Sequence, residues 1–345
     1  MMRHTGFGSR TSIIGIHLLA WIVVCSLLAV GCGGSDGNSG TSSVTYSGPE
    51  TPALITQDNA NTLSASALET RTGATGFTEF ASLDGTAEAV GESYQPFLTG
   101  VSTAIKGAME QIDYNTASNQ YQTAASQTDA DLISGTCGGN ASYAIEVDTD
   151  TGAFSGQVAF NDFCEEGVTI DGSATFSGVV NVNTYELESY RFSFSYLTAI
   201  SQTESYTMDG LVDISISGST VIVTMDMTLQ DNNLDRICKV EGYQLLLTDG
   251  DGQIEIEVSG RFYDPDYGYV DLETEQSLII NEGDDYPSSG AVVLTGELGT
   301  AGGATKARLT ALSASQCQVE ADTDGDGVYD YQSEAISWSE LDDSI

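Results

Sequence analysis

The sequence predicts a mainly β (α+β) fold: a large, strongly curved antiparallel sheet or barrel of about twelve strands, with a small N-terminal helical segment packed on it. From about residue 140 onward, apolar and polar side chains alternate with a period of two, which is typical of half-buried antiparallel strands. Turn sequences rich in Asp, Asn, Gly and Pro separate these runs. About twelve such runs are too many for one flat open sheet, so we expect the sheet to curl, close or split.

The N-terminus has the pattern of an export signal. Arg3 and Arg10 precede an apolar run over residues 13–30, and no acidic residue occurs before Asp36. A basic region followed by an apolar region is typical of such signals. The run of about 18 residues could also form an uncleaved membrane anchor.

Residues 28–32 (LAVGC) and the glycine that follows resemble the lipobox of bacterial lipoproteins, although Ala29 stands where Leu is commoner. The resemblance implies a signal peptide over 1–31 and acyl chains, palmitate among them, that attach Cys32 to membrane lipid. Gly33 stands where Asp tends to retain such proteins at the inner membrane. The resemblance therefore implies the outer membrane, with the body facing the periplasm or the cell surface.

Two segments precede the strands. Residues 32–50 are Gly/Ser-rich, which predicts a flexible tether. Residues 51–130 predict a helical or irregular cap, with a helix over 57–69 capped by Thr56 and another over 96–112 that has one apolar stripe. The second helix could cover an end or the concave face of the sheet, or it could gate a lipid-binding hollow.

Four cysteines of the exported chain predict two disulfides. A hairpin about the turn at 149–152 pairs positions that sum to 301, which places Tyr143 opposite Val158 and Val147 opposite Phe154. Cys137 faces Cys164 in the same register, and a slip of one residue would reverse every side chain. We therefore predict a Cys137–Cys164 disulfide and, by elimination, a Cys238–Cys317 disulfide.

Residues 131–345 form the predicted β domain. A transmembrane barrel would also alternate, but acidic side chains occur along most of the strands and the chain ends in LDDSI, which disfavours a lipid-facing last strand.

The charge balance excludes several classes of function. The chain has 50 acidic and 10 basic residues, and removal of Arg3 and Arg10 with the signal leaves eight basic side chains and a net charge near −42. Both histidines also lie in the signal, so the mature chain has no Ser-His-Asp triad and no histidine-bound metal. A field this negative repels phosphate backbones, and we expect no nucleic-acid partner.

The segment 322–330 (DTDGDGVYD) has the opening pattern of an EF-hand loop, with acids at positions one, three and five and glycine at six. Asp322, Asp324, Asp326 and Asp330 are the candidate calcium ligands. Position twelve is Ser333 where a bidentate carboxylate is usual, so a weak site or a solvated acidic turn are the two interpretations.

Aromatic residues flank the acidic turn at 264–266. Tyr263, Tyr267 and Tyr269 could form a platform that binds a sugar or a partner, or they could cover the edge of the core.

The mature chain loosely resembles a set of uncharacterised acidic, Gly-rich outer-membrane lipoproteins of Gram-negative bacteria. The resemblance rests on the lipobox, on the segments YSGPETPA at 46–53, CGG at 137–139, FCEEG at 163–167 and GYV at 268–270, and on the Asp-Gly-Asp-Gly segment near Trp338. It implies no activity. We predict a non-enzymatic binding or structural module of the cell envelope, with a polysaccharide or a protein as candidate partner. The alternatives are a carboxylate-dependent glycoside hydrolase and a carrier of an apolar ligand in a β hollow.

Overall fold

The structure, a computed structural model, describes residues 43–68, 131–148, 150–165, 167–183, 187–202, 205–250 and 252–342. Within these ranges, none of the helices has the length and apolar character that crossing a bilayer requires. The predicted helix over 96–112 and the candidate lipidation site at Cys32 lie outside the described residues.

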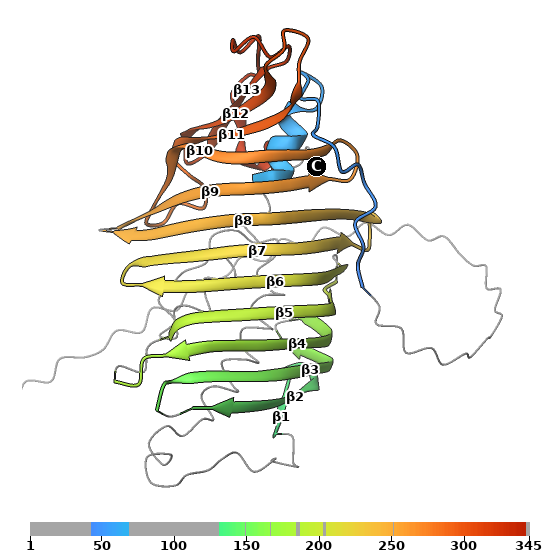
Figure 1. Cartoon of the computed structure of the whole chain (residues 1–345), viewed down its shortest axis with the longest axis vertical. Helices are drawn as coiled ribbons and strands as arrows, with labels where there is room; N and C mark the ends of the chain where they lie inside the picture. The colour runs from blue at the N-terminus through green and yellow to red at the C-terminus, as the bar shows by residue number, and fades with distance from the viewer. Residues whose placement is uncertain are drawn as a thin grey trace, which may run out of the picture. The chain divides into compact units, whose positions relative to one another are not determined.

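The described strands form one antiparallel sheet (Figure 1). The strands are β1 (Asp131–Ser134), β2 (Gly138–Val147), β3 (Ala153–Glu165), β4 (Val168–Val180), β5 (Leu187–Ile200), β6 (Ser205–Ser217), β7 (Thr220–Asp231), β8 (Arg236–Gly250), β9 (Gln253–Asp264), β10 (Gly268–Asn281), β11 (Ser289–Leu298), β12 (Ala304–Ser313), β13 (Gln316–Asp322), β14 (Tyr331–Gln332) and β15 (Ile336–Ser337). Three of these fifteen, β1, β14 and β15, have four residues or fewer. The predicted number of about twelve corresponds to the long strands β2 to β13.

The sheet is a meander in which each strand up to β14 pairs with its neighbours in sequence, while β15 pairs with β13. It is an open sheet and not a closed barrel. Because neighbouring strands are antiparallel, all odd-numbered strands up to β13 run in the same direction. Their C-terminal ends lie along one border of the sheet, which runs across the strands, and we call this border the odd-strand edge. The arrowheads of β7 and β9 in Figure 1 mark this edge.

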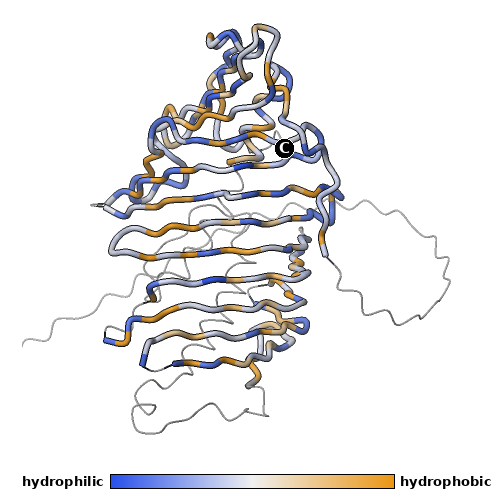
Figure 2. Tube along the Cα trace, viewed as in Figure 1, coloured by the Kyte–Doolittle hydropathy of each residue, from blue (hydrophilic) through white to orange (hydrophobic). Residues whose placement is uncertain are grey.

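Hydropathy alternates along the strands (Figure 2), and the burial of alternate residues separates an inner, apolar face from an outer, polar face. On the inner face Phe192, Val212, Val223 and Tyr243 have no exposed surface. Each such side chain contributes roughly 1.5–3 kcal/mol through its removal from water. The inner face is therefore the core of the protein.

Bulges bend this sheet in a repeated way. At three places an Asp faces two residues of a neighbouring strand, and the second of these residues has a positive φ between 48° and 55°. In each case the Asp carboxylate accepts a hydrogen bond from the N–H of that residue. The pairs are Asp171 with Asp162 (3.0 Å), Asp209 with Tyr196 (3.0 Å), and Asp226 with Gly242 (2.7 Å). Bulges increase local twist, so this row accounts for the strong curvature.

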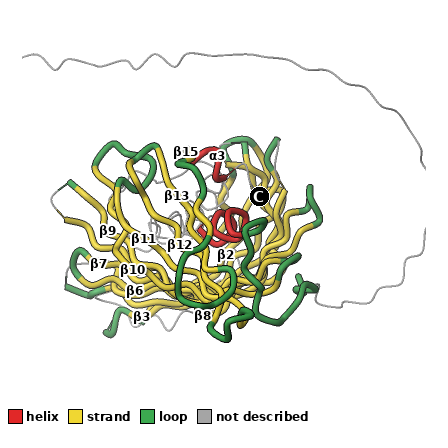
Figure 3. Tube along the Cα trace, turned by 90° about the horizontal axis from the view of Figure 1, so that it is seen from above, coloured by secondary structure: helices red, strands yellow, loops and turns green. Residues whose placement is uncertain are grey.

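Two short helices pack on the inner face, which Figure 3 shows curving around them. The first covers residues 60–68, three residues later than the predicted start, and the Thr56 carbonyl accepts the N–H of Ala60 at 3.0 Å. Tyr243 of β8 donates its hydroxyl to the carbonyl of Ala67 at 3.2 Å. The second helix is α3 (Trp338–Asp342), whose buried indole stacks on Tyr286.

The predicted hairpin and the first disulfide are confirmed. Tyr143 pairs with Val158 and Val147 pairs with Phe154, as the sum of 301 requires. The register shifts by one residue near Gly138, and Cys137 is joined to Cys164 with 5.1 Å between the Cα atoms.

The predicted Cys238–Cys317 disulfide is wrong. Cys238 lies on β8 and Cys317 on β13, five strands further along the sheet, and the structure forms no disulfide between them. Neighbouring strands are about 4.8 Å apart, whereas the Cα atoms of a disulfide lie within about 7 Å of each other. The elimination assumed that every cysteine of the domain pairs with another, and sheet order does not allow it here.

Candidate functional site

The first described segment, residues 43–56, crosses the strands along the odd-strand edge, and we call it the strap (Figure 1). Its first anchor is the N–H of Val44, which donates to the carboxylate of Asp209 on β6. Tyr46 donates its hydroxyl to the carbonyl of Asp264 at 2.7 Å, and its ring meets that of Tyr263 edge-on at 5.5 Å. Residues 43–50, which the sequence predicts as part of the tether, are therefore attached to the sheet at Val44 and Tyr46.

The second half of the strap forms hydrogen bonds with strands β10, β11 and β12, which come later in the sheet order than β6 and β9. Ala53 donates its N–H to the carbonyl of Tyr269 on β10 at 2.7 Å, and its own carbonyl accepts the N–H of Glu297 on β11 at 2.7 Å. The N–H of Ile55 donates to the hydroxyl of Thr305 on β12 at 3.1 Å. The strap therefore ties β6 to β10, β11 and β12 with backbone groups.

Asp264 is a buried carboxylate beneath the strap. It is 0% exposed and accepts the N–H groups of Asp266 (2.8 Å) and Tyr267 (3.2 Å). Arg236 lies 3.3 Å from it. Burial raises the pKa of Asp264, although these donors and Arg236 oppose the rise. A raised carboxyl pKa is one mark of a general acid, but a fully buried carboxyl with these partners has no access to substrate.

The predicted aromatic platform is covered by other groups of the protein. The rings of Tyr263 and Tyr269 lie 5.4 Å apart, so the structure brings two of the three tyrosines together. Lys239 lies over the Tyr263 ring at 4.5 Å, and the guanidinium of Arg261 lies over the Tyr269 ring at 3.8 Å. Tyr267 is instead 40% exposed at the tip of the β9–β10 turn. The stacking faces are therefore occupied by cations and not presented to a sugar.

Two carboxylates hold this cluster in place. Tyr263 donates its hydroxyl to Glu241 at 2.6 Å, and Asp271 accepts from Arg261 at 2.7 Å. The Tyr263 hydroxyl and then Lys239 lower the pKa of Glu241, whereas burial and then Glu241 raise the pKa of Tyr263. The cluster is an internally satisfied network on the outer face.

Three of the four predicted calcium ligands converge. Oxygen atoms of Asp322, Asp324 and Asp326 all lie within 4.8 Å of one another. Asp322 is 2% exposed, and its two oxygens accept the N–H groups of Gly325 and Gly327, both at 2.8 Å. The loop is therefore shaped by its own backbone, with three carboxylates on one side.

Asp330, the fourth predicted ligand, does not belong to this converging group. Its carboxylate accepts the N–H (2.9 Å) and hydroxyl (2.7 Å) of Thr323, and these bonds lower its pKa. Ser333, at position twelve, accepts the N–H of Val319 at 3.0 Å and joins the loop to β13. Calcium usually has six to eight oxygen ligands, so these three carboxylates would supply only part of a coordination shell.

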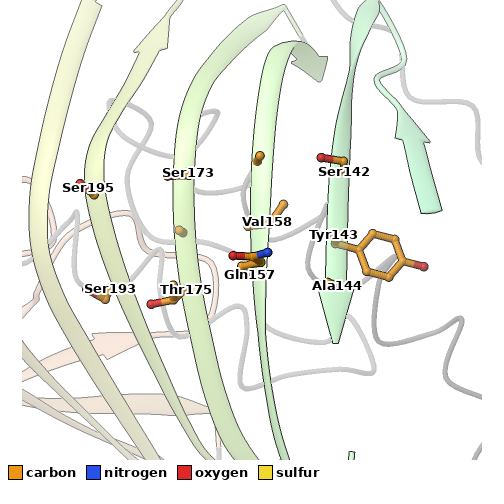
Figure 4. A pocket seen from close by; sticks show the side chains of 11 residues that line it. Ser142, Tyr143, Ala144, Gln157, Val158, Ser173, Thr175, Ser193 and Ser195 are labelled. Atoms are coloured by element: carbon orange, nitrogen blue, oxygen red, sulfur yellow. The ribbon is translucent and has the colours of Figure 1, made fainter. Parts of the chain in front are cut away.

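A shallow trough of about 290 Å³ lies on the outer face of β2 to β5 (Figure 4). Most of its lining residues are small, polar and uncharged, and the others are three alanines, Tyr143 and Val158. The polar residues include Ser142, Gln157, Ser173, Thr175, Ser193 and Ser195. Cross-strand pairing aligns them, since Gln157 faces Thr175 and Thr175 faces Ser193. Sequence reasoning missed this site because no strand contributes more than three lining residues, and its signal is the run of small polar residues at outward positions of four successive strands.

No family model, no curated protein and no solved structure matches this chain.

Proposed function

We propose that this chain is an outer-membrane lipoprotein, held by acyl chains on Cys32, whose body is a non-enzymatic binding or structural module of the cell envelope. The observation that carries the proposal is the strap. Val44 follows Cys32 by twelve residues, and from there the backbone bonds to strands from β6 to β12. A load applied at an anchored Cys32 is thus passed into the middle of the sheet. The Cys137–Cys164 disulfide supports an oxidising compartment.

The contact surface that we propose is the trough on β2 to β5. Its hydroxyl and amide groups can donate and accept hydrogen bonds, and its lining carries no charge. On a chain this acidic, a neutral lining favours a neutral polar partner over a charged one. A polysaccharide of the envelope has this chemistry, and a protein partner is the alternative outcome.

The two competing functions have less support among the described residues. For a hydrolase, Asp264 has the raised pKa of an acid catalyst but is fully buried. For a carrier of an apolar ligand, the hollow would have to be open, whereas inner-face side chains such as Phe192 and Val212 are already shielded from solvent.

Metabolic labelling with radioactive palmitate tests the anchor. We expect label in the wild-type protein, loss of label in Cys32→Ala, and unchanged label in Cys25→Ala, which removes a cysteine from the same apolar run. Unlabelled wild-type protein, or labelled Cys32→Ala protein, would refute the proposal.

Binding to purified peptidoglycan and to a soluble neutral glucan tests the trough. Ser173→Arg with Ser193→Arg fills it with bulk and charge, and we expect at least a tenfold loss of affinity. Ser215→Arg is the matched control, since Ser215 is an exposed serine of the same face on β6. Equal affinity of both variants, or no binding by the wild type, would remove the trough as a glycan site.

A further inference from the structure

Exposed large apolar side chains gather at the odd-strand edge. Five of them occupy the tips of successive turns or strand ends at this edge: Ile200 (46% exposed), Leu234 (62%), Tyr267 (40%), Leu298 (68%) and Val328 (62%). They follow or end β5, β7, β9, β11 and β13 in that order. At the opposite edge, the described residues of this kind are Val182 and Leu312. The two edges of one sheet therefore differ sharply in character.

The spacing of the five side chains is regular. Consecutive members are separated by two strands, which is about 10 Å at the usual strand spacing of about 4.8 Å. The row from β5 to β13 therefore extends over roughly 40 Å. Single apolar side chains at such intervals make no contiguous patch of the kind that a protein partner covers. A row of separate apolar tips instead fits a soft, continuous surface, such as the headgroup layer of a bilayer.

The strap connects this edge to the predicted anchor. It begins at residue 43 beside β6 and runs along the odd-strand edge (Figure 1). Residue 43 follows Cys32 by eleven positions, and a flexible chain of that length has a mean reach of roughly 17–20 Å. An acyl anchor at Cys32 therefore holds this part of the edge close to the bilayer.

We propose that the odd-strand edge faces the membrane and that its five apolar tips enter the headgroup layer. This proposal rests on the lipid anchor proposed above. The anchor makes tip insertion an intramolecular event, so weak individual contacts are enough to orient the body. Acidic residues adjoin the tips, Asp235 beside Leu234 and Asp266 beside Tyr267. They repel anionic lipid, so the edge should prefer zwitterionic headgroups.

Tryptophan quenching by brominated lipid tests the orientation. The sequence has two tryptophans, of which Trp21 lies in the predicted signal peptide and Trp338 is 2% exposed and so serves as a constant background. Leu234→Trp places a reporter at the edge, and Ser219→Trp places one in an exposed turn at the opposite edge. Each variant is prepared as the full lipidated chain in vesicles of phosphatidylethanolamine and brominated phosphatidylcholine.

We expect the emission of Leu234→Trp to be quenched at least threefold more than that of Ser219→Trp, and to move to shorter wavelength. Leu298→Trp, a second tip, should behave like Leu234→Trp. Equal quenching at both edges, or none at either, would overturn the proposed orientation. Flotation of the same samples separates the two proposals, since vesicle-bound protein with unquenched tips refutes the orientation alone, whereas protein that does not float refutes the anchor.

Discussion

The carboxylate of Asp209 accepts the backbone N–H of Tyr196 at 3.0 Å and holds that residue at a φ of 53°, in the left-handed region that L-residues seldom adopt. The second oxygen of the same carboxylate accepts the N–H of Val44, the first anchor of the strap. One side chain therefore maintains a bulge of the sheet and the attachment of the strap.

Removal of this carboxylate should weaken both features. We expect Asp209→Ala to lower the free energy of unfolding by about 1–3 kcal/mol, because the partly buried N–H of Val44 and the exposed N–H of Tyr196 both lose their acceptor. Asp213→Ala is the control on the same face of β6, since its partner Arg191 is exposed and such ion pairs contribute about 0–1 kcal/mol. Urea unfolding measures the difference, and faster cleavage after Glu50 by a glutamate-specific protease reports release of the strap. Equal losses in the two variants would contradict this role.

The Cys137–Cys164 disulfide closes a loop across 27 positions. In the chain-entropy model, a loop of this size stabilises the fold by about 3–4 kcal/mol. Cys137→Ser with Cys164→Ser should therefore lower the free energy of unfolding by that amount. Reductant should destabilise the wild type equally and leave the double variant unchanged. A further loss in the double variant on reduction would contradict assignment of the effect to this bond.

Asp264 should give a distinctive dependence of stability on pH. Its pKa is raised in the folded state, so the folded protein holds this proton more tightly than the unfolded chain, whose Asp pKa is about 3.9. The contribution of Asp264 to stability therefore falls as pH rises from about 4 through the folded-state pKa. The unfolding free energy of the wild type minus that of Asp264→Asn should therefore decrease as pH rises over this window. A difference that stays constant over this window would contradict a raised folded-state pKa of Asp264.

The acidic loop gives a prediction for metal binding. With three converging carboxylates, we expect weak calcium binding, with a dissociation constant of about 10⁻⁴–10⁻³ M. Asp324→Asn with Asp326→Asn should weaken it at least tenfold in calorimetric titration with calcium chloride. Asp284→Asn with Asp285→Asn alters another acidic turn and is the control. If the two double variants behave alike, the loop is a solvated turn.

Much of the sheet follows from local pattern. Alternation places the long strands, and the turn at 149–152 fixes the register that joins Tyr143 to Val158. These features depend on residues close in sequence, so one chain is enough to predict them.

The remaining features join residues that are far apart in sequence. The carboxylate of Asp209 accepts the N–H of Val44 across a separation of 165 residues, and no local sequence pattern predicts this contact. The first half of the strap is predicted as part of a flexible tether because residues 32–50 are rich in Gly and Ser. The single aromatic residue Tyr46, which anchors the strap, is not enough to indicate a fixed position. Three of the four acidic residues of the calcium pattern converge, whereas Asp330 bonds to Thr323.

The meander also sets an order of assembly. Each long strand pairs with its neighbours in sequence, so hairpins can add one after another with short loops to close, and low contact order favours rapid folding. The strap is different, because Ile55 must meet Thr305 across 250 positions. Although the residues of the strap are synthesised before those of the sheet, the strap can dock fully only after β12 has formed. Docking of the strap is therefore the final step of folding, and it takes place in the segment nearest the predicted anchor.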